Sequence, residues 1–158
     1  MVQNRDTDMN TRRTRTDNSR RVKGPAPRPC ASCPYRQDSP SGVWHASEYQ
    51  KLTAYDSPTY AQPERLFLCH QNDADSDAAR LCSGWVGCHG TELLALRLAT
   101  VDGTLEAEDI DSTLTYRSPI ALFGSGREAA DHGVTDIENP GVTAQAAISK
   151  IVRRRGLR

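Results

Sequence analysis

The segment Cys-Ala-Ser-Cys-Pro-Tyr-Arg, residues 30–36, decides how this chain is expected to fold. A C-x2-C turn brings two thiol groups to one point, as tetrahedral metal binding requires. Three more cysteines follow, Cys69, Cys82 and Cys88, so that the chain holds an odd number, five. An odd number, in a chain whose N-terminal residues do not resemble a secretory signal, argues against a framework of disulfide bonds. We therefore expect Cys30 and Cys33 to be part of a metal or cluster site.

The other ligands must come from separated parts of the chain. Cys69 ends the apolar run Leu66–Cys69, and Cys82 lies between apolar side chains. Both positions suit ligands that are half-buried against a core. Cys88 is either a fifth thiol outside the site or the fourth ligand in place of Cys82. His70 and His89, which directly follow cysteines, are further alternates.

The spacing of the cysteines also bears on the cofactor. Structural zinc sites often use two C-x2-C pairs. This chain has one such pair and separated single cysteines, a pattern that iron–sulfur sites accept more readily. We therefore favour an iron–sulfur cluster, with zinc as the second choice and uncoordinated thiols as the third.

Periodicity and capping signals predict a mostly helical chain. Helices are expected over residues 44–54, 91–100, 105–114, 125–132 and 142–155, and the apolar run 66–69 predicts a short buried strand. Residues 84–88 are expected to turn tightly, because glycines bracket Trp85 and Val86. The expected fold class is α+β, mostly α-helical: a small single domain built around a four-cysteine metal or cluster site.

Charge divides the chain of 158 residues into parts. Residues 1–28 hold eight basic and three acidic side chains and almost nothing apolar, which predicts a disordered basic arm. Residues 29–155 are expected to form the cysteine-motif domain, and residues 156–158 a basic tail end. Residues 150–158 hold five basic side chains and no acidic one, although the net charge of the chain is zero.

The basic ends have two interpretations, and both stay open. They attract nucleic acid by releasing its counterions, or they serve the fold. For the arm, the second interpretation is a solubilising tail that folds back on the acidic body. The second interpretation of the run Arg153–Arg155 is that cations are favourable at a helix C-terminus. A host protein is the other expected partner.

Several classes of protein are disfavoured. No segment approaches the ~20 apolar residues that cross a bilayer, so we expect no membrane contact and a cytoplasmic location. The sequence has no Walker loop, Rossmann glycine pattern or H-E-x-x-H motif. No catalytic acid–base pair is visible, which leaves enzymatic activity open but favours a protein that is not an enzyme.

Four short motifs together resemble an uncharacterised four-cysteine protein family of actinobacteria and their phages. They are Cys30-x-x-Cys33-Pro34-Tyr35-Arg36, Ser41-Gly42-Val43-Trp44, Phe67-x-Cys69-His70 and Cys82-x-Gly84-Trp85. The resemblance runs from about Arg28 to Arg155. It implies a site formed by Cys30, Cys33, Cys69 and Cys82, with Cys88 outside it.

These expectations lead to a first functional hypothesis. The protein would be an intracellular accessory protein that binds a metal or iron–sulfur cluster and acts in regulation, contacting nucleic acid or the transcription machinery through its basic termini. The alternatives are a cluster-dependent redox protein or enzyme component, and a structural zinc module for protein–protein contact.

Overall fold

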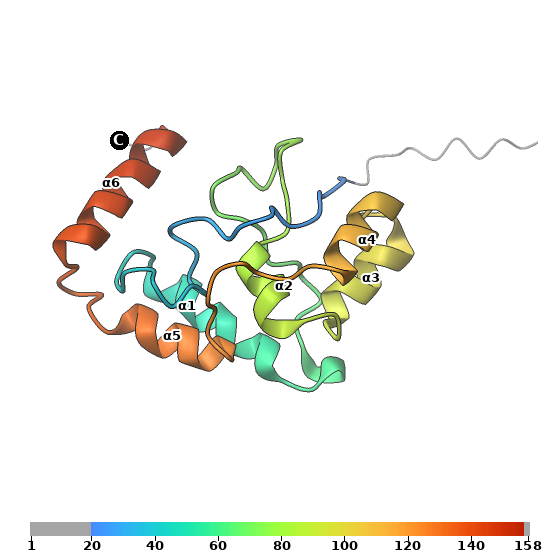
Figure 1. Ribbon diagram of the computed structural model, residues 1–158, viewed down its shortest axis with the longest axis horizontal. Coiled ribbons are helices and arrows are strands. Elements are labelled where there is room, and N and C mark those ends of the chain that lie inside the picture. The colour runs from blue at the N-terminus through green and yellow to red at the C-terminus, as the bar shows by residue number, and fades with distance from the viewer. Residues whose placement is uncertain (1–19, 157–158) are drawn as a thin grey trace, which may run out of the picture.

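Six α-helices form most of the regular structure in residues 20–156, the part of the chain that the computed structural model describes. They are α1 (Ala46–Thr53), α2 (Ser83–His89), α3 (Leu94–Asp102), α4 (Ala107–Leu114), α5 (Gly126–Val134) and α6 (Val142–Arg155). Two short 3-10 helices, η1 (Ala54–Asp56) and η2 (Thr59–Ala61), follow α1. In Figure 1, α2 lies near the centre, α1 and α5 lie at its lower left, and α3 and α4 lie at its right. Helix α6 stands at the other end of the molecule from α3 and α4.

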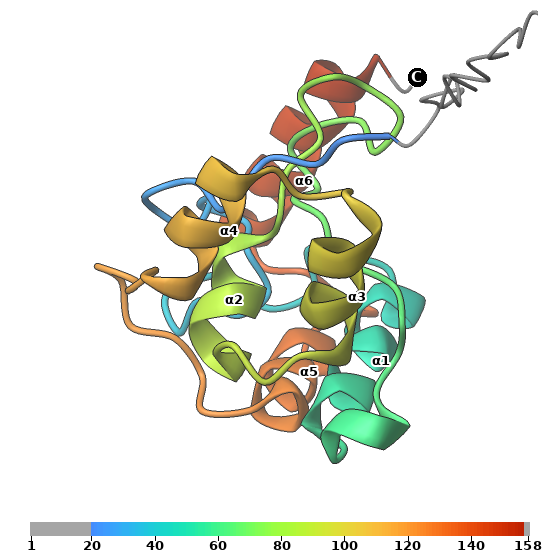
Figure 2. The same cartoon turned by 90° about the vertical axis from the view of Figure 1, so that its right-hand side faces the viewer.

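The closest helix pair is α1 and α5, which lie side by side in Figures 1 and 2. Tyr49 and Leu52 of α1 are buried against two glycines of α5. A Cβ at Gly133 would lie closer than 3.0 Å to the Tyr49 ring, and one at Gly126 closer than 3.0 Å to the Leu52 carbonyl oxygen. The absence of these two side chains therefore lets the helices approach.

The carboxylate of Asp56 ties η1 to the start of α5. It accepts hydrogen bonds from the backbone N–H groups of Gly126 at 2.7 Å and Arg127 at 2.8 Å. The hydroxyl of Ser125 accepts another from the N–H of Glu128 at 3.1 Å. These acceptors satisfy N–H groups that have no partner within the helix.

The expected helices are confirmed, with shifted ends for most of them. Helix α6 has the predicted bounds, whereas α3 begins three residues later than expected, at Leu94. The tight turn expected at 84–88 is wrong, because these residues lie within α2. Trp85 and Val86 are buried there, and tertiary packing overrides the low helix propensity of the glycines.

The strand expected at 66–69 is not formed as a named strand. In residues 20–156, β-structure is limited to isolated bridges, one of which pairs Leu68 with Leu81 in antiparallel orientation. The pairing consists of two hydrogen bonds, from Cys69 N to Arg80 O and from Cys82 N to Phe67 O, each 2.9 Å long. It stops there because Cys69 enters a turn and Cys82 is the N-cap residue of α2.

The expected basic arm, residues 1–28, falls only partly within the described chain. Residues 1–19 lie outside the described residues, as do residues 157 and 158 of the expected tail end. Residues 20–28 lie along the domain. Val22 is buried, and its N–H donates to Thr104 O at 3.0 Å; Lys23 exchanges backbone hydrogen bonds with Ala79 and Leu81. This part of the expected arm is therefore built into the fold.

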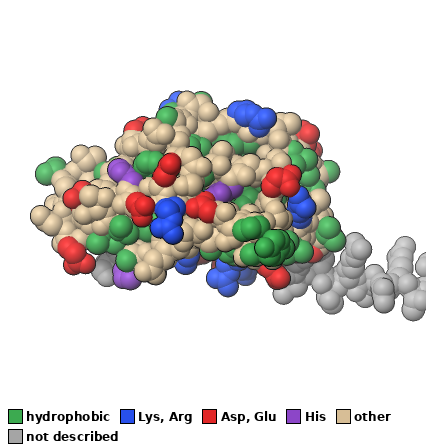
Figure 3. Space-filling view, turned by 90° about the horizontal axis from the view of Figure 1, so that it is seen from below, with side chains coloured by type: hydrophobic (Ala, Val, Ile, Leu, Met, Phe, Trp, Pro, Cys, Tyr) green, Lys and Arg blue, Asp and Glu red, His purple; other side chains and the backbone are tan. Residues whose placement is uncertain are grey.

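The surface is mixed in character. On the face seen in Figure 3, acidic and basic side chains are interspersed with hydrophobic ones. None of the helices within residues 20–156 has both the length and the apolar character needed to cross a bilayer.

Candidate metal centre

The C-x2-C segment forms a tight turn. The N–H of Cys33 donates to Cys30 O at 2.9 Å, and the N–H of Arg36 donates to Cys33 O at 3.1 Å. Tyr35 is completely buried and anchors the turn in the core. Two consecutive turns of this kind bring the thiols of Cys30 and Cys33 together.

Cys69 and Cys82 reach this turn through the short antiparallel pairing of residues 67–69 with 80–82. Cys69 and Cys82 lie at opposite ends of that pairing. Cys69 is half-buried, as is Cys30, whereas Cys33 and Cys82 are buried. We call Cys30, Cys33, Cys69 and Cys82 the cysteine cluster.

Two sulfur atoms of the cluster, those of Cys33 and Cys82, are in direct contact. Cys33 Sγ lies 3.7 Å from Cys82 Sγ, and the thiol of Cys30 interacts with the thiols of both Cys33 and Cys69. The contacts therefore run in the order Cys69, Cys30, Cys33, Cys82. All of these residues are free cysteines.

The contacts place negative charge on one sulfur. Hydrogen bonds from the thiols of Cys33 and Cys69 lower the pKa of Cys30 to about 2. Hydrogen bonding to Cys30, followed by Cys82 and burial, raises the pKa of Cys33. The hydrogen bond to Cys30 and burial likewise raise the pKa of Cys69. Without a cation, one thiolate is thus stabilised by neighbours that keep their protons.

Gly84 makes room for the cluster. A Cβ at this position would lie closer than 3.0 Å to Cys33 Sγ and 2.8 Å from the Cβ of Tyr35. The first turn of α2 can lie directly against the Cys33 sulfur only because residue 84 has no side chain. This close approach also gives the Gly84-Trp85 pair of the sequence motif a physical role.

The alternates Cys88, His89 and His70 are engaged elsewhere. Burial, with the carboxylates of Asp56 and Glu128 nearby, raises the pKa of Cys88 to about 12. His89 Nε2 lies 3.1 Å from the Tyr35 hydroxyl. Burial lowers the pKa of His89.

His70 turns away from its neighbour Cys69. Its Nε2 lies 2.8 Å from Glu48 Oε2, and its ring packs on Trp44 with the centroids 4.7 Å apart. His70 and His89 thus have other partners, whereas Cys33 and Cys82 lie in contact. The four-cysteine site that the family resemblance implied stays a prediction.

The cluster does not form a closed cage. In the part of the chain that the structure describes, no three His, Cys, Asp or Glu side chains are placed so that they could hold a metal ion as they stand. The Cys69 thiol interacts with Cys30 by hydrogen bonding, whereas Cys82 affects the pKa of Cys69 only through its charge. The four thiols are an open chain of contacts, and a metal site would need Cys69 and Cys82 to converge.

Polar and aromatic groups surround the cluster. The hydroxyl of Ser32 lies 3.8 Å from Cys30 Sγ and accepts a hydrogen bond from Gln71 Nε2 at 2.9 Å. Trp44 Nε1 donates to Ser32 O at 2.8 Å. Trp85 is completely buried, and its indole N–H has no hydrogen-bond partner among the described residues.

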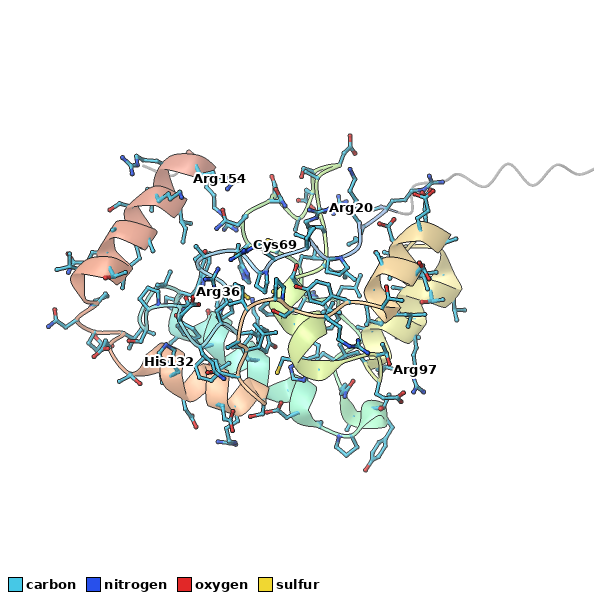
Figure 4. All side chains as sticks on the ribbon, viewed as in Figure 1. Arg20, Arg36, Cys69, Arg97, His132 and Arg154 are labelled. Carbon is cyan, nitrogen blue, oxygen red and sulfur yellow. The ribbon has the colours of Figure 1, made fainter. Side chains whose placement is uncertain are left out.

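Two basic side chains beside the cluster could not be assigned from the sequence. Arg154 Nη1 donates to Gln71 Oε1 at 2.6 Å, and Arg155 donates to His70 O. Figure 4 shows Cys69 and Arg36 near the centre of the molecule, with Arg154 on the facing side of α6. The only signal in the sequence was the run of arginines itself, which does not reveal that α6 packs across the segment after Cys69.

Comparison with known proteins identifies a family. No curated protein and no solved structure matches the chain significantly. One family profile does match, and it covers residues 25–155, which include the whole cysteine cluster and α6. The chain therefore belongs to the Family of unknown function (DUF6283).

Proposed function

We propose that the protein is a metal-binding accessory protein in which Cys30, Cys33, Cys69 and Cys82 hold a single metal ion. The observation that carries the proposal is the distance of 3.7 Å between Cys33 Sγ and Cys82 Sγ. A zinc–sulfur bond of about 2.3 Å implies a separation of about 3.8 Å between two sulfurs of a tetrahedral site. One edge of such a tetrahedron is thus present without any movement.

The same distance supports a change in the order of the two cofactors. In a four-iron cluster, each thiolate binds a different iron, so its sulfur ligands lie farther apart than two thiolates on one ion. Thiols in direct contact therefore disfavour a four-iron cluster and suit two thiolates on one metal ion, and zinc becomes the first choice. The iron–sulfur cluster, which the spacing of the cysteines favoured, becomes the second candidate.

A bound ion would stabilise the fold. The three pieces of chain that carry the cysteines are joined by few backbone hydrogen bonds, and ligand bonds would connect them directly. Because a preformed site does not exist in an unfolded chain, the free energy of metal binding adds to the free energy of folding. The donor set suits zinc, which binds thiolates strongly.

The wider role stays a prediction. We propose that the metal-stabilised domain acts in regulation by contacting nucleic acid or a host protein through its basic ends. Arg153, which is exposed at the end of α6, supports this role. The redox or enzyme-component alternative has no comparable support from the geometry.

Metal analysis of gently purified protein tests the proposal. The protein is isolated without air and assayed for zinc, iron and sulfide, and its absorption spectrum is recorded. We expect a colourless protein with about one zinc per chain. Iron with inorganic sulfide and a brown colour would instead support the cluster, and protein that binds neither metal would end the proposal.

A further inference from the structure

A cavity of about 660 Å³ opens beside the cysteine cluster. Its walls come from the segment before and after the C-x2-C turn, from residues that follow Cys69, from the start of α2 and from one face of α6. Cys30, Cys69 and Cys82 lie in its lining. The volume is in the range of pockets that bind small molecules, about 300–1,000 Å³. We call this cavity the basic pocket.

The charge of the basic pocket differs from that of the domain around it. Residues 20–156, which include every residue of the lining, hold 17 acidic and 15 basic side chains. The pocket lining reverses this ratio, with one acidic side chain, Asp38, and five basic ones. The five are Arg28, Arg36, Arg80, Lys150 and Arg154. Basic side chains are thus concentrated in the basic pocket, whereas acidic side chains predominate in the rest of the described chain.

Internal partners account for only some of these cations. Arg36 binds the Asp38 carboxylate through two nitrogens, at 2.7 and 2.6 Å, and Arg154 donates to Gln71. Within residues 20–156, the side chains of Arg80 and Lys150 make no hydrogen bond or salt bridge. The side chains of Asn72 and Thr143, also in the lining, make no hydrogen bond there either.

The cysteine cluster does not balance the remaining charge. Asp38 offsets one of the five cations, which leaves a surplus of about four positive charges. Four thiolates around one divalent ion would carry about two negative charges, and a cluster without metal carries less. A surplus of at least about two positive charges therefore remains in either state, and a dianion would balance about two of them.

The uncharged part of the lining indicates more than an inorganic ion. Ala147 and Ile151 of α6 line the pocket together with Ala26 and Pro40. Such a pocket suits a ligand with a charged end and an apolar body. Arginine binds phosphate oxygens through two donors, and lysine binds them as a point charge.

We propose that the basic pocket binds a small phosphate monoester, with its phosphate held by Arg80 and Lys150 and its organic part against α6. The observations that support this are the volume of the cavity, the reversed charge and the two cations without internal partners. The proposal does not depend on the metal, because the positive surplus exists with or without it. It extends the proposed function by adding a ligand beside the cysteines.

Calorimetric titration of the full chain with defined probes tests the proposal. The probes are inorganic phosphate, ribose 5-phosphate, adenosine monophosphate and, as uncharged reference, adenosine. We expect at least one phosphate monoester to bind more tightly than inorganic phosphate, and adenosine not to bind. Arg80→Gln and Lys150→Gln should each weaken binding about tenfold, because each removes a charge-assisted hydrogen bond.

Arg97→Gln provides the matched control. Arg97 lies on α3, well away from Arg36 and Cys69 in Figure 4, and pairs with Glu92. Its substitution makes the same change in net charge but should leave binding unchanged. Equal weakening by Arg97→Gln, or no binding of any monoester at millimolar concentration, would overturn the proposal. Thermal unfolding of each variant shows whether it is folded, and Lys150→Gln, at an exposed site on α6, remains informative if Arg80→Gln is not.

A DNA duplex is titrated in parallel over a range of salt concentrations. Duplex binding that Arg80→Gln weakens, without binding of any monoester, would assign the cations to a nucleic-acid backbone and overturn the small-molecule proposal. Zinc is assayed in the same samples. Monoester binding by a protein that neither contains nor takes up zinc would end the proposed zinc site and leave the basic pocket intact, whereas zinc without monoester binding would do the reverse.

Discussion

The α1–α5 pair and the cysteine cluster are held together by different means. The helices are packed through buried Tyr49 and Leu52 against glycines, so their contact needs only apolar burial and close approach. The cluster joins three separate pieces of chain through a few backbone hydrogen bonds and contacts between thiols. The first region needs no further group, whereas the second, under the proposed zinc site, would gain stability when a cation converts thiol contacts into ligand bonds.

Removing one thiol of the cluster should have the largest effect on stability and metal content. If it has little effect, the contrast between the two regions is wrong. We expect Cys33→Ser to lower the zinc content to near zero and the free energy of unfolding by about 4 kcal/mol or more, because loss of a metal site belongs to the most damaging changes. Metal assays and denaturant unfolding measure both effects. Cys88→Ser is the matched control, since within residues 20–156 no hydrogen bond joins its thiol to the cluster. Equal metal loss in both variants would contradict the ligand assignment.

Filling the space between the helices should have the next largest effect. In Gly133→Ala, the new methyl group would overlap the Tyr49 ring, and we expect a loss of about 3 kcal/mol with unchanged zinc content. Urea unfolding and a zinc assay test this. Gly141→Ala, where a Cβ meets nothing within 4 Å, should cost below about 1 kcal/mol. A similar loss in both variants would show that close approach of α1 and α5 is not required.

A methyl group at Gly84 tests the place where α2 meets the cluster. We expect Gly84→Ala to cost about 2 kcal/mol and to weaken zinc binding, because the methyl group displaces Cys33 Sγ. Competition with a chromophoric chelator measures the affinity. Gly87→Ala is the matched control on the same helix, since its Cβ would meet the side chain of Leu122 and not a cysteine. If the two variants bind zinc alike, Gly84 has no specific role at the cluster.

The smallest effect should come from the protonation of His89. Burial lowers the pKa of His89 in the folded protein, so the unfolded chain binds more protons once the pH falls below the ordinary value of about 6.5. Stability is therefore greatest above that pH and decreases as the pH falls through it. His89→Gln should reduce this decrease between pH 7.5 and 5, measured by urea unfolding at each pH. An identical pH dependence in both proteins would mean that His89 does not contribute.

The helices could be predicted from sequence to different degrees. Helix α6 was predicted with the observed bounds, because apolar side chains recur on one face between Pro140 and the closing arginines. Helix α2 was missed, because Gly84 and Gly87 lower its local propensity. It forms since Trp85 and Val86 bury their side chains in the core, and that gain depends on residues far away in the chain.

The sequence by itself determined the number of cysteines, the C-x2-C turn and the surplus of basic side chains near both ends. These are local properties, set by residue identity and short spacing. Only the tertiary structure decided that Cys82 and not Cys88 meets Cys33, and that Arg80 and Lys150 line one cavity. Both depend on the packing of segments dozens of residues apart, where many weak contacts together determine which side chains meet.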